Sequence, residues 1–138
     1  ETVGQRIIRS IKVLREAFLG RRRFDEYAEQ LGIARNVLAS RLARLVEEGV
    51  LEKVPYQERP ERFEYRLTEK GIDLWPVVVA LLQFGDAYYA PDGPPVVLTH
   101  KDCGGRVDAH RICDTCGKRL TARDVTGGPG PGARPVAA

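Results

Sequence analysis

The pattern that decides the fold lies in residues 32–51, Gly-Ile-Ala-Arg-Asn-Val-Leu-Ala-Ser-Arg-Leu-Ala-Arg-Leu-Val-Glu-Glu-Gly-Val-Leu. Its leucines recur at i, i+4 and i+7, the spacing of one buried helix face: Leu38, Leu42 and Leu45. Gly49 ends this helix, and Gly32 separates it from a shorter predicted helix that Asp25 caps. Two helices joined by a short glycine-containing turn are typical of the helix-turn-helix.

The flanking segments extend this motif to a winged helix. Upstream, apolar residues at helical spacing predict an earlier helix that ends at Gly20: Ile7, Ile11, Leu14 and Phe18. Downstream, residues 50–54 and 63–67 alternate apolar and charged side chains, which predicts a hairpin with a long tip, the wing. A further helix is expected at about 69–89, with Pro76 bending or confining it.

Composition divides the chain into four segments. Residues 1–90 are expected to form the winged helix-turn-helix domain, and the prolines of 91–95 predict a linker. Residues 96–125 hold all three cysteines and both histidines, which predicts a small zinc-ribbon-like extension. Residues 126–138 are rich in Gly and Pro and are expected to be a disordered tail. The expected fold class is therefore mainly α with a small β-hairpin wing, plus this extension.

Several classes of protein are disfavoured by composition. The 138 residues, 43% of them hydrophobic, allow one ordinary domain with a small satellite. We expect no membrane-spanning helix, because no run of about 18 apolar residues is present. No signal peptide precedes the first charged residues, so the cytoplasm is the expected location. An enzyme is disfavoured, because no serine or carboxylate motif accompanies the histidines and no phosphate-binding glycine loop is present.

The third predicted helix has a basic front, since every charged residue between Ala34 and Val46 is an arginine. Arginine can bond guanine bidentately, Asn36 can do the same with adenine, and small side chains let the backbone approach the major groove. We therefore predict DNA contacts from this front, from the wing and from the segment before the second helix. The predicted contact residues are Arg22, Arg23, Arg35, Asn36, Ala39, Ser40, Arg44, Arg59 and Arg62.

Some of these arginines have other interpretations. Arg59 and Arg62 of the wing would contact phosphates or enter the minor groove, or be ordinary solvated surface. The run at 21–23 is expected either to hold the DNA backbone or to pack near the sheet edge. Residues 21–66 hold ten basic and nine acidic side chains. Binding must therefore depend on geometry and on doubling in a dimer, because the general positive field is weak.

Motifs in residues 10–90 follow one another in a familiar order: residues 13–20, 22–26, 32–42, 45–51, 56–60, 64–71 and 81–86. In this order they resemble the HxlR-type winged-helix regulators of bacteria. The resemblance implies a MarR-like homodimer, formed by the first helix and the helix after the wing, which binds operator DNA to repress or activate transcription. It also implies a small-molecule or redox effector, with a pocket near Trp75, Phe84 and Tyr88, although interface or core packing is the alternative for these aromatics.

The sequence departs from this family at three places. The family usually has tryptophan where Arg9 stands and an aliphatic residue where Lys12 stands. Either that face is exposed here or it meets an acidic partner or ligand. The family also often has a cysteine before the first helix, used by some members as a thiol sensor, and no such cysteine is present.

The cysteines and a histidine form two half-sites with metal-ligand spacing. His100-x2-Cys103 followed by Cys113-x2-Cys116 is a tetrahedral Cys3His set, for which structural zinc is the expected ion. His110 is the rival fourth ligand, but choosing it leaves the first half-site with one ligand. The alternatives to zinc are a metal-free reduced hairpin or a Cys113–Cys116 redox pair.

A protein-interaction module is the alternative function from another class. Winged helices sometimes bind proteins, and zinc ribbons do so often. A loss of DNA affinity with rising salt distinguishes a DNA-binding protein from such a module, because phosphate contacts release counterions.

Overall fold

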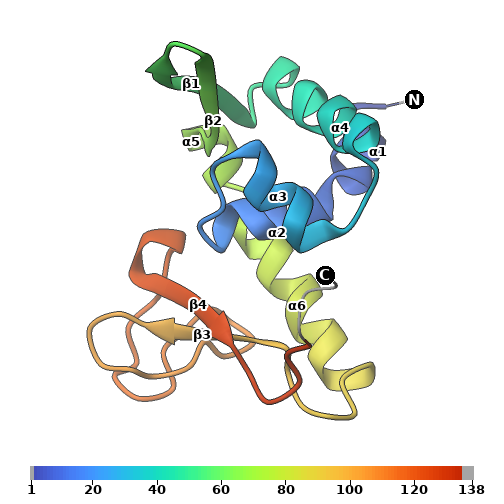
Figure 1. Ribbon diagram of the computed structural model, residues 1–138. Helices are drawn as coiled ribbons and strands as arrows, with labels where there is room; N and C mark the ends of the chain where they lie inside the picture. Colours follow the sequence, from blue (N-terminus) through green and yellow to red (C-terminus); the bar gives the residue numbers. More distant parts are fainter. Residues whose placement is uncertain (1, 135–138) are drawn as a thin grey trace. The chain divides into compact units, whose positions relative to one another are not determined.

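The computed structural model describes residues 2–134, which form two compact units, residues 2–74 and 75–134 (Figure 1). The division lies between Leu74 and Trp75, whereas the sequence predicted a linker at 91–95. The single helix expected at 69–89 is wrong, because two helices stand there: α5 (Glu69–Ile72) and α6 (Trp75–Tyr88). Pro76 explains the break, since in a continuous helix its ring would clash with the carbonyl of Ile72.

Four helices build most of the first unit: α1 (Val3–Arg9), α2 (Ile11–Phe18), α3 (Phe24–Leu31) and α4 (Arg35–Glu47). The earlier helix predicted as continuous is broken at Ser10, which is buried and closes α1 with its backbone amide. Gly20 ends α2 in a left-handed conformation, as expected. Asp25 lies in the first turn of α3 and does not cap it. The cap position belongs to Arg23, whose amide donates to the Glu26 carboxylate at 2.8 Å.

The core of the first unit contains the predicted helix face. Leu38, Leu42 and Leu45 of α4 are each at most 1% exposed, which confirms the spacing argument. Other fully buried side chains are Val13, Leu14, Tyr27, Val50 and Leu51. The Tyr27 hydroxyl lies 3.0 Å from the carbonyl oxygens of Arg21 and Tyr65, and burial raises the pKa of this phenol. These contacts tie α3 to the segment before it and to the strand that contains Tyr65.

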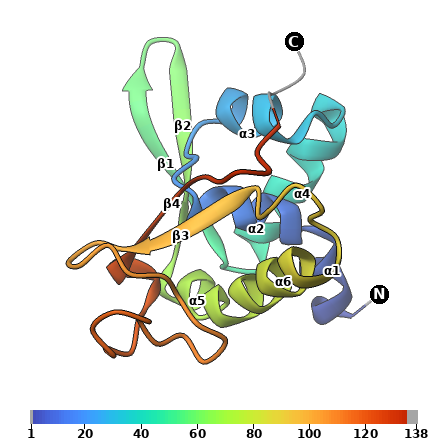
Figure 2. The same ribbon diagram turned by 90° about the horizontal axis from the view of Figure 1, so that it is seen from below.

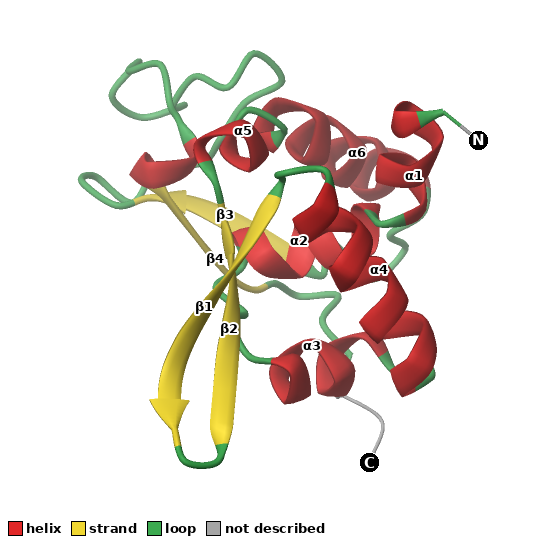
Figure 3. Cartoon of the chain, turned by 90° about the horizontal axis from the view of Figure 1, so that it is seen from above, coloured by secondary structure: helices red, strands yellow, loops and turns green. Residues whose placement is uncertain are grey.

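The wing is an antiparallel hairpin of β1 (Leu51–Glu58) and β2 (Glu61–Leu67), the long twisted yellow pair in Figure 3. The strands are longer than predicted, so the tip is only Arg59 and Pro60 and the expected long tip is wrong. A bulge between Pro55 and Gln57 absorbs the proline, which has no amide to donate, and pairing resumes beyond it.

The second unit joins α6 to a two-stranded sheet of β3 (Val96–His100) and β4 (Val125–Pro129) (Figure 2). A single 3-10 turn, Ala122–Asp124, precedes β4. Gln83 of α6 donates to the carbonyls of Val107 and Asp108, which ties this helix to the loops of its own unit. No helix among the described residues has both the length and the apolar character needed to cross a membrane.

The tail predicted to be disordered from residue 126 is wrong for residues 126–129. They pair in register with β3, from His100 opposite Val125 to Val96 opposite Pro129. The glycines do not prevent this, because the ladder is made of backbone hydrogen bonds that need no side chain. Residues 135–138 of the predicted tail lie outside the described residues.

Candidate DNA interface and candidate metal centre

Helix α4 turns its buried leucines inward and leaves its predicted contact face in solvent. Arg35, Asn36, Ala39, Ser40 and Arg44 are all exposed. The side chains on this face are arginine, amide, hydroxyl and methyl groups. It therefore offers hydrogen-bond donors with little bulk between them, which suits close approach to base edges.

Two arginines of this face make contacts that DNA could replace. Arg35 donates to Asp25 of α3 at 3.0 Å, and its guanidinium lies 4.7 Å from the centre of the Phe24 ring. The two ends of the Arg35–Asp25 pair are 68% and 75% exposed, so water weakens it. Arg44 lies 3.7 Å from Glu47 one turn further along α4. Replacing such an exposed ion pair with a contact to a phosphate or a guanine therefore costs little free energy.

The wing arginines lie at the predicted place. Arg59 forms the tip with Pro60, and Arg62 stands opposite Gln57 at the start of β2, with both arginines exposed. Because these two residues lie at the end of the hairpin, their side chains can reach outward from the first unit while its core stays unchanged.

The arginines before α3 differ from one another. Arg22 donates to the carbonyls of Ala17 and Arg21 at 3.0 and 2.9 Å, so its guanidinium satisfies backbone groups at the C-terminal end of α2. Its own carbonyl accepts from the Tyr65 amide of β2 at 2.6 Å, which is the sheet-edge packing that was the alternative to DNA binding. Arg23 is exposed and lies over the Tyr56 ring of the wing, 4.3 Å from its centre. Arg23 is therefore the more exposed of the two.

The second unit contains two turns of the same geometry, one at each half-site. In the first, the His100 amide donates to the Gly105 carbonyl at 2.8 Å and the Gly104 amide donates back to His100 at 2.9 Å. In the second, the Cys113 amide donates to the Lys118 carbonyl at 2.9 Å and the Gly117 amide donates back to Cys113 at 3.0 Å. Each turn presents two ligand side chains three residues apart.

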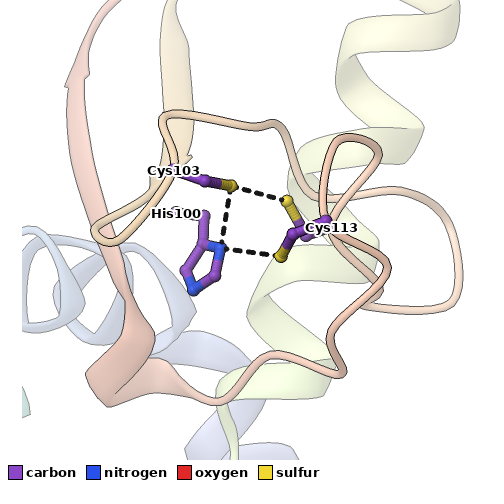
Figure 4. A group of neighbouring side chains, drawn as sticks. His100, Cys103 and Cys113 are labelled. Carbon is purple, nitrogen blue, oxygen red and sulfur yellow. Dashed lines mark hydrogen bonds between the residues drawn. The ribbon is translucent and has the colours of Figure 1, made fainter.

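These turns bring His100, Cys103, Cys113 and Cys116 together, with all four ligand atoms within 4.8 Å of one another. Figure 4 shows three of these side chains, His100, Cys103 and Cys113, gathered around one point. The His100 Nδ1 atom lies 3.2 Å from the Cys103 sulfur and 3.4 Å from that of Cys116, and the Cys103 and Cys113 sulfurs are 3.4 Å apart. Ligands around tetrahedral zinc are about 3.5–3.8 Å apart, given Zn–S and Zn–N bonds of about 2.3 and 2.1 Å. The four atoms thus surround a space of the right size for one such ion.

The electrostatics of the three thiols favours a bound cation among them. The Cys116 amide hydrogen-bonds the Cys113 sulfur, the Thr115 amide assists, and the pKa of the Cys113 thiol falls to about 6. At Cys103 the Gly105 amide lowers the pKa, but the neighbouring Cys113 sulfur, desolvation and Cys116 outweigh it and the pKa is raised. Three crowded sulfurs cannot all become thiolates without a positive charge among them.

His110 is not part of this group. It is exposed on a loop, where its amide donates to the Asp108 carboxylate at 2.7 Å. His100 is only 2% exposed, and its Nε2 atom is buried with no hydrogen-bond partner; the nearest carboxylate, Asp102, is 3.7 Å away. A metal ion bound through Nδ1 would leave the ring proton on Nε2.

One residue of the centre was missed by the sequence analysis. Gly105 is buried, and a side chain there would collide with the Cys113 sulfur and with Thr115. The Gly104-Gly105 doublet after Cys103 is the signal that could have identified it. By contrast, the pocket predicted near Trp75, Phe84 and Tyr88 is not supported. Trp75 is buried at the start of α6, and the nine residues to Phe84 rise about 13.5 Å along a helix.

The HxlR-like helix-turn-helix family matches residues 4–93, about two thirds of the chain. The chain belongs to this family. An uncharacterized HTH-type transcriptional regulator of Mycobacterium tuberculosis, Rv3095, is 52% identical to it over 133 residues, which cover 96% of this chain and 83% of that protein. The protein is accordingly a DNA-binding transcription regulator of the HxlR type, with a MarR-like winged helix.

Two solved structures extend the comparison. PA1607, described as a candidate transcription factor, has a TM-score of 0.64 at 43% identity and covers 81% of this chain and 79% of its own. A second such protein, PA1374 from Pseudomonas aeruginosa, has a TM-score of 0.56 at 38% identity and covers 91% of this HxlR-type chain and 86% of its own. Alignments this long include part of the second unit as well as the winged helix.

Proposed function

We propose that this HxlR-type regulator occupies operator DNA as a homodimer, with α4 in the major groove and the wing on the adjacent backbone or minor groove. The observation that carries the proposal is the exposed face of α4, where arginine, amide and small side chains stand opposite a fully buried leucine stripe. On this basis the contacts come from Arg23, Arg35, Asn36, Ala39, Ser40, Arg44, Arg59 and Arg62. Arg22 supports the fold beside them.

An apolar stripe on α6 supports the homodimer. Its members follow one helix face at i, i+4, i+7 and i+11 and are each 48–74% exposed: Val77, Leu81, Phe84 and Tyr88. The opposite face of the helix is buried, with Trp75, Val78 and Val79 at most 6% exposed. A continuous exposed apolar stripe marks an interaction surface, and a second copy of the chain offers the same stripe in return.

A dimer would double a weak electrostatic attraction. Each first unit is nearly neutral between residues 21 and 66, so one copy gains little from a general field. Two recognition helices spaced about 34 Å apart would enter successive major grooves on one side of the duplex. Operator occupancy then represses or activates according to where the operator lies relative to the promoter.

We further propose that the Cys3His centre holds a zinc ion with a structural role. Four protein ligands fill a tetrahedral shell and leave no open position for chemistry. When bound, the ion supplies the positive charge that lets three thiolates lie side by side. Support comes from the duplicated turns, the close approach of Gly105 to the Cys113 sulfur and the burial of the His100 ring.

An electrophoretic shift with the protein's own upstream promoter region tests the DNA proposal. Affinity should fall steeply as salt rises. The double variant Arg35→Ala/Arg44→Ala should lose at least tenfold in affinity, since each base or phosphate contact contributes about 1–3 kcal/mol. Lys12→Gln, which removes an exposed cation from α2, is the matched control. Unchanged binding by the double variant would show that α4 is not the recognition helix.

A further inference from the structure

Helices α1 and α4 lie next to each other in the first unit (Figure 1). A basic cleft lies between them. It is open to solvent and has a volume of about 440 Å³. Its lining includes four arginines and no acidic residue: Arg6, Arg9, Ser10, Asn36, Val37, Ser40, Arg41 and Arg44. A concave surface with this lining attracts an anion.

The cleft is built from one face of each helix. Arg6 and Arg9 are three residues apart on α1, and Asn36, Ser40 and Arg44 follow one another at single turns along α4. The two helices are joined by an ion pair, in which the Arg6 guanidinium donates to the Glu48 carboxylate at 2.7 and 3.1 Å. This pair fixes α1 against the end of α4 and thereby sets the width of the cleft.

The donors of the cleft match a phosphate group. Guanidinium groups form bidentate hydrogen bonds with phosphate oxygens, and hydroxyl and amide donors complete the remaining positions. Arg41 makes no ion pair within residues 2–134, and the Arg44–Glu47 pair is exposed and 3.7 Å long. At least these two guanidinium groups can therefore turn toward a bound anion at little cost.

Arg9 is an exposed cation at the end of α1, and it lines the cleft together with residues of the recognition helix. We propose that the α1–α4 cleft is a phosphate-binding site, in which Arg9 and Arg41 hold the phosphate oxygens. The phosphate belongs either to the DNA backbone beside the recognition helix or to a free phosphorylated ligand. Only the DNA case rests on the proposed function.

The first arm of the test uses no DNA. Thermal unfolding of the full chain is followed in sodium phosphate and in sodium chloride at equal ionic strength, for the wild type, Arg9→Gln, Arg41→Gln and the control Lys12→Gln. Inorganic phosphate at tenfold excess over its Kd should raise the Tm of the wild type and the control by about 5 °C. Each arginine variant should lose most of that shift.

The second arm measures DNA affinity against salt for the same proteins. If the phosphate is that of the backbone, Arg9→Gln and Arg41→Gln should each reduce the salt slope by about one, and Lys12→Gln should not. If the arginine variants lose the phosphate-induced Tm shift but keep the salt slope of DNA binding, the cleft binds a free phosphorylated ligand. If they reduce the salt slope and phosphate does not shift the Tm of the wild type, the cleft binds the DNA backbone. The inference is overturned if both arginine variants match the control in both arms. If the wild type binds no DNA, the proposed function fails and the first arm alone decides the cleft.

Discussion

Gly104 and Gly117 adopt the same left-handed backbone conformation, with φ of +75° and +74°, each directly after a cysteine of the candidate metal centre. The pair shows that the two half-sites are copies of one turn, although their ligands differ. A histidine begins the first turn and a cysteine the second, and both turns use glycine where a side chain would be strained.

This relationship predicts graded effects of alanine substitution. Gly104→Ala and Gly117→Ala should each lower the free energy of unfolding by about 1–2 kcal/mol, since a positive φ is unfavourable for alanine. Gly105→Ala should cost more and also lose metal, because its methyl group would collide with the Cys113 sulfur. Gly128→Ala, which meets nothing within 4 Å, is the control for urea denaturation. Equal stability of all four variants would contradict the duplicated-turn account.

Substitution of the two histidines should separate ligand from bystander. Purified wild-type protein is expected to contain about one zinc per chain by elemental analysis. His100→Ala should lose the metal and His110→Ala should keep it, because only the His100 ring lies among the sulfurs. A metal-free wild type under reducing conditions would exclude the zinc proposal, and equal loss from both variants would exclude the assignment of His100.

The start of α3 should give the first unit an acid-sensitive stability. The amides of Arg23 and Arg22 donate to the Glu26 carboxylate, and these bonds lower its pKa below the usual 4.5. The carboxylate is therefore favoured in the folded state, so its contribution is present above pH 4.5 and is lost as the pH falls through the lowered pKa. Unfolding of Glu26→Gln, measured against pH, should lack this component. If Glu26→Gln shows the same pH dependence of stability as the wild type, Glu26 does not stabilise α3 through its charge.

A charge on the α6 stripe should separate the dimer. Leu81→Glu and Phe84→Glu place carboxylates where two apolar stripes would meet, so sedimentation at micromolar concentration should show monomers. Ala87→Glu, on an exposed position about a quarter turn from the stripe, is the control and should stay dimeric. A monomeric wild type would contradict the homodimer, and dimeric variants would place the interface elsewhere.

Local spacing alone predicted much of this protein. The buried face of α4 followed from three leucines, because helical periodicity depends only on neighbours along the chain. The four ligands of the metal centre were predictable in the same way, since each x2 spacing lies within a single turn. The wing hairpin followed from alternation, although its length did not.

Other features depended on partners far away in the chain. Residues 125–129 form a strand only because β3, about 25 residues earlier, supplies hydrogen bonds to a segment whose composition indicates disorder. The contacts of Arg22 with the carbonyls of Ala17 and Arg21 could not be read from its place in a run of three arginines. The basic cleft needed α1 to fold back beside α4, which the break at Ser10 allows. Sequence determined which faces and turns this protein has; the tertiary structure decided which of them meet, because those contacts join residues that local periodicity does not relate.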